Sequence, residues 1–364
     1  MTRLNIARDR LHNQRIGAAT LRTPGEVVGW LAAVQAQDYA GAKWALGLRM
    51  QSATDNDIER AFAEGSILRT HLIRPTWHFV TPMDIRWMLA LTAPRVHAIN
   101  ASMYRKLELN RAILERSNAT LSQALQGERQ LTRDELRNVL EEAGIVAGGG
   151  LRLAYIIMSA ELDEVICSGA RRGKQFTYAL LDERAPHVKS LEREEALAEL
   201  TRRYFLSRGP ATVRDFAKWS GLTIADARRG LDEVKAQLRK EVVDDQAYWF
   251  SSSMPSGKDV SPVACLLPAY DEYLSGYKDR SAIGDAEVGV RLAALGNALS
   301  GIIVVDGQIV GAWKRTLRKN AVVIEADLFI RLTEAEDYAV NQAAQKYGEF
   351  LELPVIRTAP TSPA

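Results

Sequence analysis

The chain has 364 residues, of which 47% are hydrophobic and 25% are charged, and this composition excludes a disordered or fibrous protein. Its formal net charge is +2, from 47 basic and 45 acidic residues, so any contact with nucleic acid must come from local clusters of charge. The sequence contains no apolar run of the roughly 18 residues that cross a bilayer, and its first residues are charged throughout, unlike a secretory signal.

Cysteine and histidine usage indicates neither a disulfide nor a metal site. Cys167 and Cys265 lie about a hundred positions apart, and we expect both to be reduced and packed as small apolar side chains, as in a reducing compartment. The five histidines show no spacing typical of metal ligands. We therefore predict no metal and no other cofactor.

Residues 1–107 form the first predicted unit, which follows a winged-helix pattern only loosely. Thr23 and Glu26 have the spacing of a capping box, in which two side chains satisfy the free amides at a helix start. A second amphipathic helix is expected near residues 55–64, and two strands that turn near Arg74 follow it.

Residues 108–188 form the second predicted unit, a pair of helices followed by a β-hairpin. Thr132 and Glu135 have the spacing of a further capping box, and another helix is expected after the glycine run at 148–150. This order of elements is that of a winged helix. Two strands then flank a basic loop that contains Arg171, Arg172 and Lys174.

Residues 189–262 repeat this order as the third predicted unit. Thr212 and Thr223, each followed three positions later by an aspartate, start two short helices that Gly221 separates. A hairpin with its turn near residues 244–246 follows. The unit is flanked by a basic cluster of Arg202, Arg203 and Arg208.

Residues 263–364 form a β-rich C-terminal region. Asp306 and Gly307, between two strand-like runs, are a strong hairpin signal, and a last helix is expected over about 333–348. The tail at 358–364 is expected to be disordered. The predicted fold is therefore mainly α with α+β character, with tandem winged-helix units and this β-rich region. A basic hairpin in it carries Lys314, Arg315, Arg318 and Lys319.

The basic clusters lie where a winged-helix protein contacts duplex DNA. One helix of such a unit enters the major groove while its hairpin contacts the backbone or the minor groove, and lysine or arginine there neutralises phosphates. A solvated charged loop explains any single cluster equally well. Several clusters on hairpins favour double-stranded DNA as the partner over a protein.

Five short segments, in order along the chain, carry a recognisable pattern: VQAQDY (34–39), HLIRPTWHFV (71–80), FAKWSG (216–221), LPAYDEY (267–273) and KDR (278–280). Together they resemble the bacterial AlkZ-like family of winged-helix DNA glycosylases. The resemblance covers nearly the whole chain and implies tandem winged helices, excision of damaged bases and no metal cofactor. The family's name-giving enzyme unhooks interstrand crosslinks made by a DNA-alkylating antibiotic. From these motifs we add to the predicted DNA-binding residues Lys218, Lys278 and Arg280.

The resemblance maps the family's catalytic Gln-x-Gln element onto Gln35 and Gln37, with Ala36 between them. We expect Gln37 to hold the attacking water, and Gln35 to orient Gln37 or the sugar. The apolar pattern of the first helix stops after Val34, which predicts Gln35 in its last turn and Gln37 in a loop shaped by Gly41. Two polar residues at the surface of a helix end are the alternative interpretation.

Further residues are candidates for supporting roles: Asp38, His71, Arg74, Thr76, His78, Tyr270 and Asp271. Alternate side chains of a strand share a face, so Arg74, Thr76 and His78 would contact the lesion or phosphates together. The alternative is equally good: Trp77 and Phe79 fill the core, and the polar face is solvated.

The remaining candidates have structural alternatives as well. Asp38 could cap the next helix instead of acting on substrate. Tyr270, Asp271 and Tyr273 follow a strand end and a proline, and an exposed turn there suits the wall of a cleft. A structural bond from a tyrosine to the backbone explains the same residues.

The sequence thus predicts a monofunctional DNA glycosylase that hydrolyses the N-glycosidic bond of cationic alkylated purines, in alkylguanine monoadducts and in interstrand crosslinks. Its role would be base excision repair or self-resistance to a genotoxic antibiotic, since this branch of the family includes both kinds of protein. We expect a monomer in the bacterial cytoplasm that acts on chromosomal DNA, with no membrane partner. The alternatives are a non-catalytic winged-helix transcriptional regulator and a protein-interaction scaffold.

Overall fold

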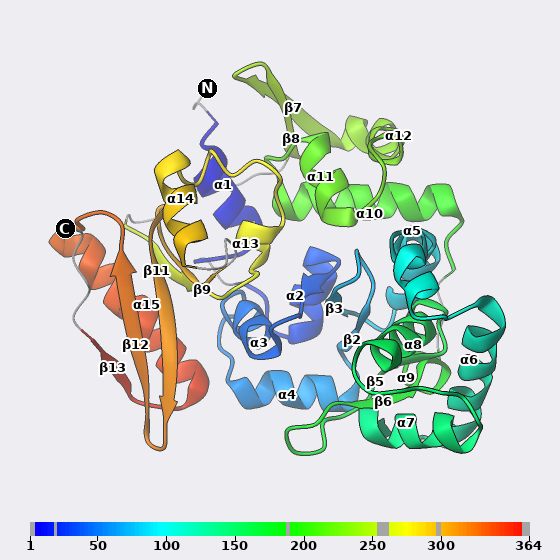
Figure 1. Cartoon of the computed structure of the whole chain (residues 1–364). Coiled ribbons are helices and arrows are strands. Elements are labelled where there is room, and N and C mark those ends of the chain that lie inside the picture. Colours follow the sequence, from blue (N-terminus) through cyan, green and yellow to red (C-terminus); the bar gives the residue numbers. More distant parts are fainter. Residues whose placement is uncertain (1–3, 18–19, 187–189, 253–261, 296–299, 359–364) are drawn as a thin grey trace.

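The computed structural model describes residues 4–17, 20–186, 190–252, 262–295 and 300–358 (Figure 1). Helices and strands mix along the chain, which confirms the predicted α+β character, and a C-terminal sheet stands at one side of the mainly helical remainder. Every helix among the described residues is too short or too polar to cross a membrane.

One order of elements recurs along the chain: a helix, a short strand, two helices and a β-hairpin. The first copy consists of α2 (Pro24–Leu31), β1 (Val34–Gln35), α3 (Tyr39–Gly47), α4 (Asp55–Glu64), β2 (Leu68–His71) and β3 (Trp77–Val80). The second consists of α6 (Arg111–Leu125), β4 (Leu131–Thr132), α7 (Arg133–Glu142), α8 (Leu151–Leu162), β5 (Ile166–Ser168) and β6 (Thr177–Leu180). In both copies the first strand pairs with the last, which gives the sheet orders β1-β3-β2 and β4-β6-β5.

The third copy consists of α10 (Arg193–Arg208), α11 (Val213–Ser220), α12 (Ile224–Val234), β7 (Leu238–Val243) and β8 (Gln246–Ser251). Its first strand is reduced to a single bridge between Ala211 and Trp249. The paired helices and hairpins predicted for the second and third units are therefore present. That they act on DNA as winged helices stays a prediction.

Capping residues fix where these helices begin and end. Gly221 ends α11 with a φ of +71°, a conformation that glycine adopts without the clash of a Cβ. The predicted capping boxes join Thr23 to Glu26, Thr132 to Glu135 and Thr212 to Asp215. Thr223 caps α12 as predicted by accepting from the Asp226 N–H, without the reciprocal bond.

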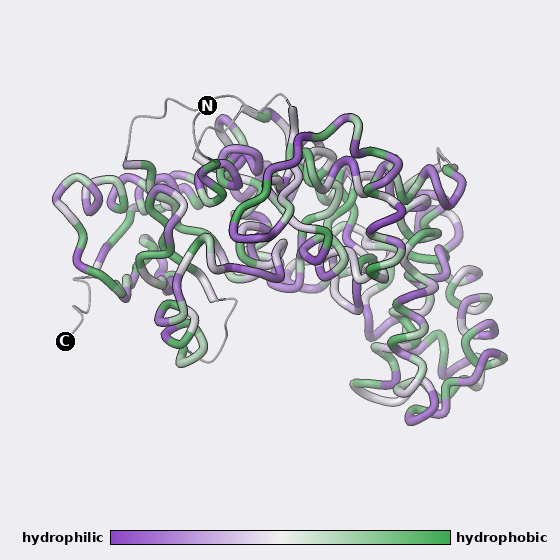
Figure 2. Tube along the Cα trace, turned by 90° about the horizontal axis from the view of Figure 1, so that it is seen from above, coloured by the Kyte–Doolittle hydropathy of each residue, from purple (hydrophilic) through white to green (hydrophobic). Residues whose placement is uncertain are grey.

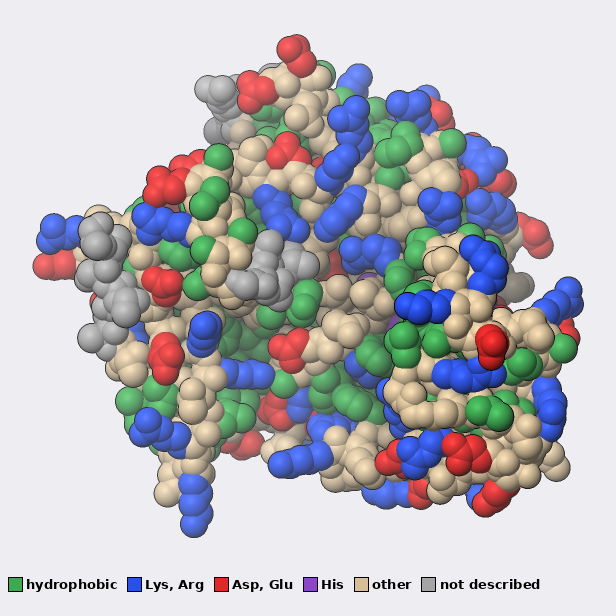
Figure 3. Space-filling view, in the orientation of Figure 1, with side chains coloured by type: hydrophobic (Ala, Val, Ile, Leu, Met, Phe, Trp, Pro, Cys, Tyr) green, Lys and Arg blue, Asp and Glu red, His purple; other side chains and the backbone are tan. Residues whose placement is uncertain are grey.

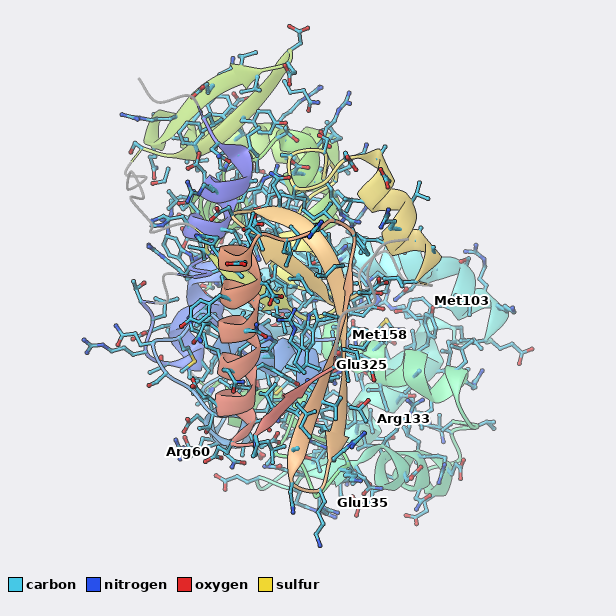
Figure 4. All side chains as sticks on the ribbon, turned by 90° about the vertical axis from the view of Figure 1, so that its left-hand side faces the viewer. Arg60, Met103, Arg133, Glu135, Met158 and Glu325 are labelled. Atoms are coloured by element: carbon cyan, nitrogen blue, oxygen red, sulfur yellow. The ribbon has the colours of Figure 1, made fainter. Side chains whose placement is uncertain are left out.

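The C-terminal region is a five-stranded sheet with helices against it. Its strand order is β13-β12-β11-β10-β9, and the strands are β9 (Ala264–Leu267), β10 (Ile302–Val305), β11 (Gln308–Arg318), β12 (Ala321–Leu328) and β13 (Val355–Arg357). The helix α15 (Glu334–Leu351) lies along one face of this sheet (Figure 4), and it confirms the predicted last helix. Asp306 and Gly307, with φ values of +48° and +88°, form the predicted tight turn between β10 and β11. The predicted disordered tail lies, beyond Thr358, outside the described residues.

Other helices connect these parts or cover them, and hydrophilic and hydrophobic residues alternate along many of them, as in amphipathic helices (Figure 2). They are α1 (Ile6–Asn13), α5 (Ile85–Lys106), α9 (Leu181–Arg184), the short 3₁₀ helix η1 (Lys235–Gln237), α13 (Glu272–Ser275) and α14 (Ala286–Ala294).

Two large apolar clusters each draw side chains from more than one predicted unit. One joins the first unit to the C-terminal region and includes Val27, Phe62, Phe79, Ile303, Tyr347 and Phe350. Another joins the first three units and includes Leu68, Met88, Met158, Tyr204 and Trp219. A smaller cluster lies between Leu109 and Leu180, within the second unit. The unit boundaries themselves stay predictions, but the first unit has no core of its own that excludes the C-terminal region.

Both cysteines are free and buried, as predicted. Burial raises the pKa of the Cys167 and Cys265 thiols to about 12, so neither is a nucleophile at neutral pH. Among the described residues, no group of three or more His, Cys, Asp or Glu side chains is arranged to hold a metal ion.

Candidate functional site

The two glutamines lie in the connection from α2 to α3, near the centre of the molecule (Figure 1). The helix α2 ends at Leu31, because Ala32 takes a φ of +62°, and not after Val34 as predicted. Gln35 therefore lies in strand β1, where it pairs with His78 of β3. The prediction that Gln35 lies in the last turn of a helix is wrong.

The chain turns into α3 directly after β1. Gln37 is exposed on this turn, whereas Gln35 is only 7% exposed. Asp38 occupies the N-cap position of α3 but makes no side-chain capping bond there. Gly41 lies inside α3 and not in a loop as predicted, and a Cβ there would lie 2.7 Å from a carboxylate oxygen of Asp38. The two carboxamides thus differ in setting, one facing solvent and the other the interior.

Three buried polar atoms beside β1 have no hydrogen-bond partner among the described protein groups. They are Oε1 of Gln35, Nε2 of His78 and Nε of Arg74. A buried polar group without a partner costs about 1–3 kcal/mol, so such groups are usually bonded to water or to a ligand. Because Gln35 and His78 lie opposite each other in the β1–β3 pair, their side chains share one face of the sheet. These buried, unpartnered polar atoms are together called the Gln35 pocket below.

His78 is neutral in this pocket. Burial, together with the positive charge of Arg74, lowers its pKa well below the usual value. Its Nδ1 lies 2.9 Å from the carbonyl oxygen of Thr76, so Nδ1 carries the proton and donates it there. Nε2 is then a free acceptor, like the carbonyl oxygen of Gln35.

A buried carboxylate, Glu272 of α13, fixes the backbone of β1. Its Oε1 accepts a hydrogen bond from the backbone N–H of Gln35 at 2.9 Å. Its Oε2 accepts bonds from Nε and Nη2 of Arg208, at 3.1 and 2.7 Å, and from the indole N–H of Trp219 at 2.9 Å. Burial alone would raise the pKa of Glu272, but Arg208 and the Gln35 N–H hold it below its usual value. The carboxylate is therefore ionised and fully bonded.

Sequence reasoning missed Glu272 and misjudged Arg208. Both are buried, with at most 1% of the residue exposed, and Arg208 also donates to two backbone carbonyls, those of Leu31 and Ala33. The prediction of Arg208 in a basic cluster at the surface is therefore wrong. Glu272 stands in the LPAYDEY motif, and membership of this motif was the one sequence feature that pointed to it.

A buried arginine holds the other side of the glutamine loop. Arg69 of β2 is 7% exposed, and its Nε donates to the carbonyl of Ala36 at 3.1 Å. Its guanidinium lies over the ring of Trp77 at 4.3 Å and over that of Phe176 at 4.6 Å, and burial lowers its pKa to about 10. Sequence reasoning gave no signal for Arg69, because its partners come from β3 and from the β5–β6 hairpin.

The turn between β2 and β3 contains Arg74, as predicted, but the shared strand face predicted for Arg74, Thr76 and His78 is wrong. Arg74 has a φ of +60°, and the hydroxyl of Thr76 donates to a carbonyl within the turn. Since β3 begins at Trp77, Arg74 and Thr76 do not share a strand face with His78. The alternative is confirmed for Phe79, which is fully buried in the core, but Trp77 is only half-buried. The solvated polar face of this alternative is wrong because His78 is fully buried.

Two predicted supporting residues have structural partners away from the pocket. His71 bonds through Nδ1 to Glu161 of α8 and packs against Trp77. Asp271, predicted in an exposed turn, is only 2% exposed and forms a bidentate ion pair with Arg49, with both bonds at 2.9 Å. The exposed setting predicted for Asp271 is therefore wrong.

The tyrosines of the LPAYDEY motif stabilise the entry to α13. Tyr270 is half-buried and has a φ of +64°. The hydroxyl of Tyr273 lies 2.8 and 3.1 Å from the carbonyls of Gly307 and Ala7. The alternative interpretation, a structural bond from a tyrosine to the backbone, is therefore confirmed for Tyr273.

The predicted DNA-binding cations occupy several settings. On the face shown in Figure 3, Lys and Arg side chains gather around a hollowed centre and at the lower hairpin tip. Arg172 is paired with Glu135 at 2.8 Å, Arg315 is bonded to the hydroxyl of Tyr347, and Arg171 is half-buried. Lys218 and Arg280 are half-buried too. The cations exposed to solvent, besides the paired Arg172, are Lys174, Lys278, Lys314, Arg318 and Lys319.

Comparisons with known proteins agree with the motifs. A family model described as "DNA glycosylase AlkZ-like" matches residues 28–350. The "Interstrand DNA cross-link repair glycosylase" of Streptomyces sahachiroi is 26% identical over 324 residues, which cover 84% of this chain and 85% of that protein. The solved structure "Streptomyces sahachiroi DNA glycosylase AlkZ" has the same fold, with a TM-score of 0.77 at 22% identity over 97% of this chain and 98% of that one.

Proposed function

We propose a substrate and a mechanism for this chain, which belongs to the AlkZ-like family of DNA glycosylases. The chain is a DNA glycosylase, and we propose that it removes cationic alkylated purines from duplex DNA, with Gln37 and Gln35 as its catalytic residues. One observation carries the proposal. The two glutamines and His78, which lies opposite Gln35, are neutral. Of the two carboxylates near them, Glu272 is fully bonded to Arg208, Trp219 and the backbone, and Asp38 stands at the N-cap of α3.

Such a neutral site suits a substrate whose base needs no protonation. Alkylation of a ring nitrogen makes the purine cationic, so when the bond from C1′ of the sugar breaks, its electron pair neutralises the departing base. Water then adds to the oxocarbenium-like sugar and its proton passes to bulk water, because a carboxamide accepts a hydrogen bond but is not a base at neutral pH. The amide dipole stabilises the developing sugar charge.

The two free acceptors in the pocket support a water site. Oε1 of Gln35 and Nε2 of His78 both require a donor, and water is the smallest molecule that donates two hydrogens. In this assignment Gln37 orients the attacking water. Gln35 holds either the Gln37 side chain or the sugar in position, through its contacts in the Gln35 pocket. His78 is a positioning residue in this assignment.

The exposure of Gln37 supports large lesions as substrates. Many glycosylases extrude a single nucleotide into a snug pocket, but a bulky adduct or a crosslink does not fit one. Gln37 is exposed, so a lesion on an intact duplex could reach it. We propose alkylguanine monoadducts and interstrand crosslinks as substrates of a monomer in the bacterial cytoplasm, in base excision repair or antibiotic self-resistance.

Release of the base tests the proposed function. The protein is incubated with duplex DNA that carries a guanine alkylated on a ring nitrogen, and free base and an abasic site are measured. We expect both products from this duplex, and none from duplexes that carry uracil or another neutral damaged base. Binding without release from any alkylated duplex would contradict the proposal and favour the transcriptional regulator.

The tip of the β11–β12 hairpin is expected to contact DNA phosphates. Arg318 and Lys319 are exposed there, at the end of the longest strand pair. Replacing both with alanine should lower duplex affinity and make the slope of log K against log salt shallower by about 1–2, since each lost phosphate contact removes about 0.9. Titrations at several salt concentrations measure this. An unchanged slope would place the hairpin outside the DNA interface.

A further inference from the structure

Three cations gather where α11, α13 and the β2–β3 turn meet, beside the Gln35 pocket. Lys218 of α11 donates from Nζ to the carbonyl of Ser275 at 2.6 Å, and Arg280 donates from Nε to the carbonyl of Leu274 at 3.0 Å. Since Leu274 and Ser275 are the last residues of α13, the two cations lie over the same end of this helix. Arg74 packs against the glycine that ends α11, three residues after Lys218.

These three side chains make no ion pair with a carboxylate in the part of the chain that the structure describes. Two acidic residues act on the charge of Lys218, and both are bonded elsewhere. Glu272, which also acts on Arg74, is paired with Arg208, and Asp215 accepts hydrogen bonds from Thr212 and from the backbone N–H of Lys278. Burial, with the charges of Arg74 and Arg280, lowers the pKa of Lys218 to about 8. Burying like charges together without a counterion is unfavourable, and an anion would relieve it.

The contacts within the protein leave most donors of the cluster free. One proton of Lys218 and one of Arg280 go to the carbonyls of α13, and Nε of Arg74 has no partner among the described groups. A solvated surface cluster would explain exposed side chains such as Lys278. It does not explain three half-buried cations that converge from separate elements.

We propose that Arg74, Lys218 and Arg280 bind one phosphate of the DNA backbone next to the nucleotide under attack. Its two non-bridging oxygens accept from donors that converge from different directions, as charge-assisted hydrogen bonds require. Arg74 links this site to the Gln35 pocket, so the bound phosphate holds the sugar in register with the attacking water. The inference rests on the proposed function for the place of this phosphate relative to the lesion.

A scan with uncharged phosphates tests the contact. A duplex with a tetrahydrofuran abasic analogue sets the register and has no base to release, and a single methylphosphonate replaces each phosphate around it in turn. For the wild type we expect one position to lose roughly tenfold in affinity, the value of one charge-assisted contact. Lys218→Met and Arg280→Met should bind the unmodified duplex more weakly and show little further loss at that position.

Arg60→Gln is the matched control for these variants. Arg60 is an exposed residue of α4 that pairs with Asp57 of the same helix, so this variant removes one positive charge that is not part of the proposed site. It should keep the full methylphosphonate penalty. A wild type without a sensitive position, or a penalty that persists in Lys218→Met, overturns the inference; thermal unfolding confirms that each variant is folded.

The pH dependence of binding gives a second test. The charged groups that act on Lys218 are Arg74 in the β2–β3 turn, Glu272 in α13, Arg280 in the loop after α13, and Asp215 in α11. A lysine is charged below its pKa, so wild-type affinity should fall several-fold between pH 7 and 9.5. Lys218→Arg keeps its charge over this range and should bind equally well throughout. Equal falls in both proteins would overturn the role of Lys218.

Both tests measure binding, so they separate this inference from the glycosylase mechanism. If the protein releases base, but no methylphosphonate position shows an affinity loss that depends on Lys218, only the phosphate site is overturned. A sensitive position in a protein that releases no base from any alkylated duplex supports the phosphate site and overturns the proposed function.

Discussion

Gln37→Ala is expected to release an alkylated guanine on the order of 10²–10³-fold more slowly than the wild type, the usual loss when a preorganised polar group at the reacting centre is removed. The carboxamide of Gln37 is exposed, so its removal leaves no cavity and the protein should unfold at the same temperature. The measurement is single-turnover base release, with protein in excess over a duplex that carries one lesion.

Gln35→Ala and Gln51→Ala complete this experiment. Gln35→Ala removes an acceptor of the Gln35 pocket and should also slow release. Gln51 is an exposed glutamine outside the loop, and its alanine variant should match the wild type. Equal rates for the wild type, Gln37→Ala and Gln35→Ala would remove the catalytic assignment of both glutamines, whatever their contribution to binding.

Glu272→Ala is expected to lower the free energy of unfolding by about 3–5 kcal/mol, because it leaves Arg208 buried without a counterion. It also removes the acceptor for the Trp219 indole and for the Gln35 backbone. Urea denaturation measures the loss. The pKa of Glu272 is lowered in the folded protein, so its stabilisation is present above the ordinary glutamate pKa and is lost as the pH falls through the lowered value.

Two variants separate the buried pair from a general effect of charge. Glu287→Ala breaks an exposed pair with Arg291 and should cost less than about 1 kcal/mol. Replacing Glu272 and Arg208 together with methionine should recover much of the stability lost in Glu272→Ala, since Arg208 is then not left buried without its counterion. A cost below 1 kcal/mol for Glu272→Ala would contradict the role given to this carboxylate.

The sequence predicted those features that depend on neighbours a few residues away. Capping boxes such as Thr212–Asp215, the stop at Gly221 and the Asp306–Gly307 turn are set by local hydrogen bonds and by backbone freedom, and each was found where expected. The Gln-x-Gln element was found through its motif, because no local rule distinguishes it from surface glutamines.

The features that sequence reasoning missed depend on partners far along the chain. The end of α2 was misplaced because Ala32 adopts a positive φ of +62°, which alanine rarely does without tertiary support. Carbonyls on both sides of Ala32 are held by Arg208, whose own partner is Glu272. No periodicity within residues 24–37 could reveal a network that joins segments about 180 and 240 positions away.

The apolar cluster that joins the first unit to the C-terminal sheet has a consequence for synthesis. Val27 and Phe79 emerge early from the ribosome, yet Ile303, Tyr347 and Phe350, which cover the same core, emerge among the last residues. The β1 strand likewise lacks the Glu272 carboxylate until most of the chain has been translated. The nascent N-terminal third therefore cannot complete its core, and it exposes apolar side chains that a chaperone could bind. A chain whose translation stops before the final helix should not form a functional glutamine loop.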